Sequence, residues 1–98
     1  MPFPNASLYL GSKAAVEQFV RSLAREIGPR NVTVNILSPG FTDTEMLNSE
    51  ESRALGASLS PFNRIGTPQE VADVSAFLAS DASRWLTGEN LQAGGGVV

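Results

Sequence analysis

The sequence of 98 residues predicts an α/β fold built on a parallel sheet, of which the chain supplies only a part. Two segments carry apolar residues at helical spacing, and a short run with strand character follows each of them. Helix, strand, helix, strand is the order of an open parallel sheet with crossover helices. Two strands rarely hold together alone in water. We therefore predict an incomplete doubly wound parallel sheet, with residues 1–98 as a single unit.

The first predicted helix follows a short loop, because Pro2 and Pro4 oppose helix at the start of the chain. Asn5 or Ser7 is available as its N-cap. Gly28-Pro29 is expected to end it. Its apolar residues fall on one face, which needs cover: Val16, Phe19, Val20, Leu23 and Ile27.

The first predicted strand covers residues 32–37, where β-branched residues recur, and Ser38-Pro39-Gly40 is expected to end it. The next 25 residues, 41–65, show no sustained period, although residues 49–59 are able to form a short helix. So long an irregular stretch in a small domain more often marks a functional loop or lid.

The second long helix has a strong start signal, because Thr67 can cap, Pro68 suits the first turn and Glu70 completes a capping box. We expect it to reach about Ala79, followed by a turn at residues 80–83 and a short strand at residues 90–93. Gly94-Gly95-Gly96 lacks the spacing of a phosphate loop and is interpreted as a turn or frayed end. Trp85 is interpreted as a core or interface anchor. We expect the buried stripe of the helix to consist of Val71, Val74, Phe77 and Leu78.

Composition excludes several classes of function. A formal net charge of -3 gives no basic patch for nucleic acid. The absence of cysteine and histidine excludes disulfides, zinc sites built from these residues, and Ser-His-Asp triads, and we predict no metal site. No stretch approaches the roughly 18 apolar residues of a membrane span. We expect a cytoplasmic protein that binds neither nucleic acid nor membrane. Because two strands cannot cover both apolar helix faces, we also expect obligate association, as a symmetric homodimer or tetramer.

Tyr9 and Lys13 are a candidate acid/base pair, because residues four apart on a helix share a face. An ammonium group near a phenol stabilises the phenolate, which lets a tyrosine exchange a proton closer to neutral pH. The same spacing also occurs in ordinary surface pairs. Similarly, Pro39-Gly40 ends a strand in any protein, and Thr44 with Glu45 is able to begin a helix.

Four motifs in order carry a family resemblance. Residues 9–16 read Tyr-Leu-Gly-Ser-Lys-Ala-Ala-Val, and residues 34–44 read Val-Asn-Ile-Leu-Ser-Pro-Gly-Phe-Thr-Asp-Thr. Residues 64–72 read Arg-Ile-Gly-Thr-Pro-Gln-Glu-Val-Ala, and Thr87-Gly88 precedes the closing glycines. Together they closely resemble the C-terminal part of short-chain dehydrogenases/reductases.

This resemblance implies a Rossmann-like fold and a hydride transfer between NAD or NADP and a small-molecule carbonyl or alcohol. It implies that Tyr9 exchanges a proton with the substrate oxygen and that Lys13 bonds the nicotinamide ribose, so both would touch the cofactor. Pro39, Gly40, Thr42 and Thr44 become further cofactor candidates, Thr42 through its backbone. The segment from Met46 to Asn63 takes the place of the family's variable substrate loop.

The departures from the family pattern leave three hypotheses open. The glycine-rich dinucleotide turn, the ribose-selecting residue and the catalytic Asn and Ser precede the Tyr in the family and are not among these 98 residues. The chain is interpreted as the C-terminal part of an oxidoreductase, inactive by itself. The alternatives are a non-catalytic homo-oligomerising remnant, or one half of a split enzyme completed by a separate N-terminal half.

Overall fold

The computed structural model describes residues 7–44 and 47–97. The expected loop at residues 1–5, with the Asn5 cap, lies outside the described residues, as does Met46 at the start of the predicted substrate loop. Helix α1 (Ser7–Ile27) begins with Ser7 as a helical residue. The helix ends at Ile27, directly before Gly28-Pro29 as predicted, and the short 3-10 helix η1 (Gly28–Arg30) follows.

The sheet pairs β1 (Ile36–Pro39) with β2 (Asn90–Ala93) in parallel, in the register Ile36 opposite Asn90. The second strand matches its predicted bounds. The predicted bounds of the first strand are wrong, because residues 32–35 lie outside the ladder and Pro39 lies inside it. The reason is the partner: Ile36 already faces the first residue of β2, so residues 32–35 lie beside the preceding loop instead of a strand.

That loop is held by specific contacts rather than by a ladder. The Val34 N–H donates to the Thr87 hydroxyl (3.1 Å), and the Gly88 N–H donates to the Val34 carbonyl (2.7 Å). The Asn35 side-chain amide donates to the Leu86 carbonyl (3.0 Å), and its oxygen accepts the Glu89 N–H (3.1 Å). The Val-Asn pair of the second motif therefore fastens the start of β1 to the turn before β2.

The segment after β1 contains helix α2 (Glu50–Leu59), which confirms the short helix expected there. Ser49 caps it by accepting the Ser52 N–H. Helix α3 (Pro68–Leu78) starts with the complete capping box that the sequence predicted, and Ala79 is its C-cap. The short 3-10 helix η2 (Asp81–Ser83) follows.

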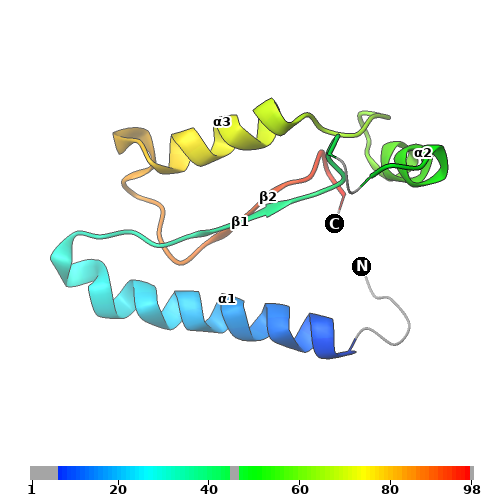
Figure 1. Cartoon of the computed structure of the whole chain (residues 1–98). Coiled ribbons are helices and arrows are strands. Elements are labelled where there is room, and N and C mark those ends of the chain that lie inside the picture. Colours follow the sequence, from blue (N-terminus) through cyan, green and yellow to red (C-terminus); the bar gives the residue numbers. More distant parts are fainter. Residues whose placement is uncertain (1–6, 45–46, 98) are drawn as a thin grey trace.

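Helices α1 and α3 lie on opposite sides of the strand pair, and α2 lies beyond one end of it (Figure 1). This arrangement is the helix-sheet-helix layering of a doubly wound fold and confirms the predicted class. Gly88, at φ 71°, packs on α1, since a Cβ there would lie 3.3 Å from the Cβ of Ala24. No helix of the described residues combines the length and apolar character of a membrane span.

The core of this part of the fold is thin. Among the described residues, the buried apolar side chains are Val20 and Ala24 on α1. Phe19 is 66% exposed and Trp85 is 96% exposed, so Trp85 is not a core residue of this chain, and its interpretation as an interface anchor stays a prediction. The expected buried stripe of α3 is wrong for this chain as well, because α3 has no buried residue and Phe77 is 41% exposed. The accessible surface of 7349 Å² exceeds the roughly 5,400 Å² expected of a compact domain of this mass. The strand pair therefore leaves apolar helix surface that it does not cover.

Candidate active site

A cleft of about 730 Å³ opens at the carboxyl ends of the two strands. In open α/β sheets ligands bind outside this edge. The N-terminal half of α1 forms one wall, and the segment after β1 and the start of α3 form the other. All six predicted site residues line the cleft: Tyr9, Lys13, Pro39, Gly40, Thr42 and Thr44.

The α1 wall carries Tyr9, Leu10 and Lys13. Tyr9 and Lys13 lie one turn apart, as their spacing predicts, and Tyr9 is 64% exposed. Lys13 is the one charged side chain among the described residues that line the cleft. Both groups can therefore meet a molecule in the cleft, and the charge they present to it is positive.

Gly40 lies at the point where the ends of the two strands touch. A Cβ on Gly40 would lie 2.6 Å from the Cα of Gly94 and 3.1 Å from its carbonyl oxygen. Neither neighbour is a flexible side chain that can turn aside. Glycine is therefore required here by the packing of β1 against the segment after β2, which is a structural reason besides the ligand approach that the resemblance implies.

Thr42 is fixed by its own turn and by a bridge to the start of α3. Its hydroxyl donates to the Gly40 carbonyl (3.1 Å). Thr42 pairs with Gly66 in a parallel bridge, in which the Gly66 N–H donates to the Phe41 carbonyl and the Asp43 N–H donates to the Gly66 carbonyl, both at 2.8 Å. In such a bridge the paired residue's own N–H and C=O point to the opposite side. The expected backbone contact from Thr42 therefore remains open.

Thr44 is exposed at the rim of the cleft, and its carbonyl accepts the Leu47 N–H (3.0 Å). Asp43 lies beside it and pairs with Arg53 of α2 (2.6 Å). Phe41 lies under α2, since a Cβ on Gly56 would come within 2.6 Å of its ring. Helix α2 is thus fastened to this wall at two points.

A polar chain across the sheet was not anticipated from the sequence. The Ser38 hydroxyl donates to the side-chain oxygen of Asn90 (2.8 Å), and the Asn90 amide donates to the Glu17 carboxylate (2.9 Å). Glu17 follows Lys13 by one turn. These hydrogen bonds therefore tie α1 to both strands close to Lys13. The signal of this polar chain was the presence of polar residues at strand positions 38 and 90. Other cleft-lining residues that were missed are Leu10, Phe41, Leu47, Pro68, Val71, Gln92, Gly94 and Val97.

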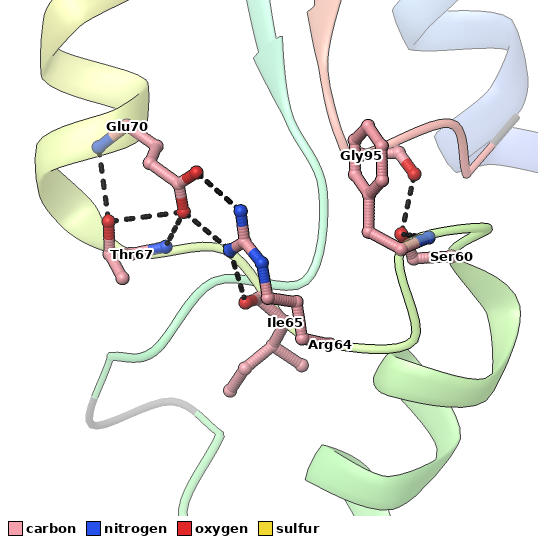
Figure 2. Close-up of polar contacts among 7 residues, drawn as sticks. Ser60, Arg64, Ile65, Thr67, Glu70 and Gly95 are labelled. Carbon is pink, nitrogen blue, oxygen red and sulfur yellow. Dashed lines mark hydrogen bonds and ion pairs between the residues drawn. The ribbon is translucent and has the colours of Figure 1, made fainter.

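A second ion pair lies at the start of α3. The Arg64 guanidinium binds both carboxylate oxygens of Glu70 at 2.7 Å (Figure 2). This hydrogen bonding from Arg64, with a further bond from the Thr67 N–H, lowers the pKa of Glu70 from 4.5 to about 2. Glu70 therefore stays ionised throughout the physiological pH range.

Comparison with known proteins agrees with this geometry. The family model described as enoyl-(acyl carrier protein) reductase matches residues 1–98. The uncharacterised oxidoreductase YjdA of Bacillus subtilis is 39% identical over 97 residues, covering 99% of this chain and 38% of that protein. The 3-oxoacyl-(acyl-carrier-protein) reductase FabG of Escherichia coli is 43% identical over 91 residues, covering 91% of this chain and 37% of that protein.

The fold is found in solved structures as well. The angucycline C-6 ketoreductase LanV, solved with bound NADP, superposes with a TM-score of 0.88 at 38% identity, covering 99% of this chain and 38% of that one. The chain thus spans about two fifths of the length of the proteins it matches. The match to the whole chain and these identities show that it belongs to the short-chain dehydrogenase/reductase family, of which it represents the C-terminal portion.

Proposed function

We propose that the chain carries the proton-transfer and nicotinamide-binding side of an NAD- or NADP-dependent oxidoreductase that interconverts a small-molecule carbonyl and an alcohol. One observation carries the proposal: six residues from two separate motifs, residues 9–16 and 34–44, line a single cleft. They lie at the sheet edge where α/β folds bind ligands. The oxidoreductases and ketoreductases among the relatives support the same general activity.

The residues of the cleft fit a nicotinamide dinucleotide in part. A volume of about 730 Å³ lies within the range of roughly 300–1,000 Å³ usual for ligand sites. The positive charge of Lys13 is opposite to that of a diphosphate, and Thr42 and Thr44 add backbone and hydroxyl groups. The glycine-rich turn that would hold the adenosine half is not among the 98 residues.

The six site residues have distinct roles in this reaction. When bound, the nicotinamide supplies the hydride chemistry. Tyr9 gives a proton to the carbonyl oxygen during reduction and takes it back during oxidation. Lys13 holds a positive charge one turn away and binds the ribose. Pro39 and Gly40 form the floor, while Thr42, through its backbone, and Thr44, through its hydroxyl, orient the carboxamide or diphosphate.

The isolated chain is expected to show no measurable turnover and weak or undetectable binding of NAD or NADP. Positioning of both reactants is worth orders of magnitude in rate, and most dinucleotide contacts come from a first βα turn that these residues do not include. NAD(P)H absorbance with a panel of ketones and alcohols measures the first, and titration calorimetry the second. Turnover that disappears in Tyr9→Phe would contradict the expectation of inactivity. Micromolar binding of NAD or NADP by the chain would contradict the expectation of weak affinity.

The catalytic assignment has its own test. The chain is joined to the N-terminal portion of the Escherichia coli reductase, or mixed with it as a separate polypeptide. We expect ketoreduction that falls by at least a hundredfold in Tyr9→Phe and Lys13→Met, because general acid catalysis contributes about 10²–10⁴ in rate. Ser12→Ala, at an exposed position on the same helix, is the control. A complemented enzyme that is indifferent to Tyr9→Phe would refute the assignment.

A homo-oligomerising role is the second candidate, and exposed apolar side chains favour it. Leu8, Phe19 and Trp85 are 87%, 66% and 96% exposed. The surface in excess of a compact domain is about 2,000 Å², well above the roughly 800 Å² that each partner buries in a standard interface. Light scattering after gel filtration tests it, with no folded monomer expected at micromolar concentration. A monomer that melts cooperatively would exclude this role.

A further inference from the structure

The segment from Ser60 to Thr67 connects α2 to α3 and is anchored at both ends (Figure 2). At its start, the buried Ser60 hydroxyl donates to the Gly95 carbonyl (2.6 Å) and accepts the Phe62 N–H (3.1 Å). At its end, Thr67 and Glu70 close the capping box of α3. A connection between two helices is usually among the more mobile parts of a domain. Here it is tied to the segment after β2 and to α3.

The Arg64–Glu70 pair extends the second anchor back along the segment. Arg64 contacts Glu70 with two parallel hydrogen bonds, and its guanidinium also donates to the Ile65 carbonyl (3.3 Å). The Glu70 Oε1 atom, which accepts one of the two bonds from Arg64, also accepts the Thr67 N–H (3.0 Å). A planar guanidinium and a carboxylate paired in this way have a defined relative orientation. The four residues from Arg64 to Thr67 are therefore held against the first turn of α3.

Gly66 lies within this held stretch and bonds to the wall of the cleft. Its N–H and C=O make the two 2.8 Å bonds to Phe41 and Asp43 that flank Thr42. Between Arg64 and Thr42 there is thus an unbroken path of hydrogen bonds and covalent backbone. Pro68 and Val71, in the first turn of the same helix, also line the cleft.

We propose that Arg64 and Glu70 are positioning residues that fix the Phe41–Thr44 wall of the cleft through the backbone of Gly66. The sequence motif at residues 64–72 is then more than a helix start, because it sets where the backbone of Thr42 and the hydroxyl of Thr44 lie. The value of this placement for catalysis rests on the proposed function, whereas the placement itself does not.

Amide hydrogen exchange by NMR on the chain tests the placement directly. Glu70→Gln removes the ionic partner of Arg64 but keeps a side chain that completes a capping box. Arg64→Met removes the cation and keeps the apolar stem. In both variants the Asp43 and Gly66 amides should exchange roughly two- to fivefold faster, the range typical of losing an exposed ion pair. Arg64→Lys, which retains the charge, should fall between them and the wild type.

Reference amides and a matched variant separate this effect from general loosening. The Ile36 and Gly88 amides donate at 2.8 and 2.7 Å at the amino ends of the strands, away from the cleft, and should keep their wild-type rates. Asp73→Asn removes an equal charge from the same helix, where Asp73 contacts only Gln69 among the side-chain hydrogen bonds of the described residues, and should change neither pair of amides. If Arg64→Met fails to fold, Glu70→Gln still provides the test.

Two outcomes would overturn the proposal. Unchanged exchange at Asp43 and Gly66 would show that the wall is held without the ion pair. A uniform increase at all four amides would show a role in stability only. No step of the exchange measurement involves NAD, NADP or turnover. A failure of the proposed enzyme activity would therefore not change the exchange result, and a failed exchange test would not bear on the activity.

Discussion

Replacement of Gly40 by alanine tests the contact between the two strand ends. The added Cβ would lie 2.6 Å from the Gly94 Cα, 3.1 Å from its oxygen and 3.3 Å from its carbonyl carbon. All three are backbone atoms, so relief requires the ends of the strands to separate. Overpacking of this kind costs about 1–3 kcal/mol. For a domain of this size each kcal/mol corresponds to roughly 4–8 °C in Tm.

Urea unfolding followed by far-UV circular dichroism, at one fixed protein concentration, measures this loss. Gly66→Ala is the matched control, because the nearest atom to its new Cβ is the Phe41 oxygen at 3.7 Å. We expect the control to be neutral or slightly stabilised. A Gly40→Ala chain as stable as the wild type would refute the packing argument and would leave approach of a ligand as the reason for glycine at this position.

Further predictions concern the helices and their ends. Gly56→Ala should weaken the docking of α2 by about 1–3 kcal/mol, because the new Cβ would meet the Phe41 ring and Cβ at 2.6–2.7 Å, whereas Gly11→Ala, with nothing within 4 Å, should stabilise α1 by up to about 1 kcal/mol in the same assay. Since folding lowers the pKa of Glu70 from 4.5 to about 2, its stabilising contribution is complete above about pH 4.5 and is lost as the pH falls towards 2. Urea midpoints at pH 5 and pH 2.5 should therefore differ more for the wild type than for Glu70→Gln, and equal differences would contradict the assignment. Asn90→Leu should destabilise the chain by about 1–3 kcal/mol by leaving Ser38 and Glu17 without their partner, and a neutral result would show the polar chain to be dispensable. Phe19→Asp with Leu23→Asp should abolish both association and folding, which gel filtration and circular dichroism would register; a folded monomeric double variant would remove the case for obligate association.

The sequence by itself determined those features whose signals are local. Thr67, Pro68 and Glu70 define the start of α3 within four residues, and the structure contains the complete capping box. Gly28-Pro29 ends α1 for an equally local reason. Pro29 has no backbone N–H to donate to the preceding turn, and its ring clashes with that turn. Tyr9 and Lys13 share a helix face because helical geometry places residues four apart together. The motifs also determined the family, because their order and spacing are visible in the sequence alone.

The tertiary structure decided everything that depends on residues far apart in the chain. The limits of β1 depended on where β2 begins, because a strand exists only where it has a partner. The reason for Gly40 lies 54 residues away at Gly94, and Phe41 explains Gly56. Likewise, no local pattern reveals that Asn90 joins Ser38 to Glu17, or that Gly66 holds the backbone beside Thr42. Local signals follow from backbone geometry within a turn or two, whereas these contacts follow from the packing of whole elements on one sheet, which one-dimensional spacing does not encode.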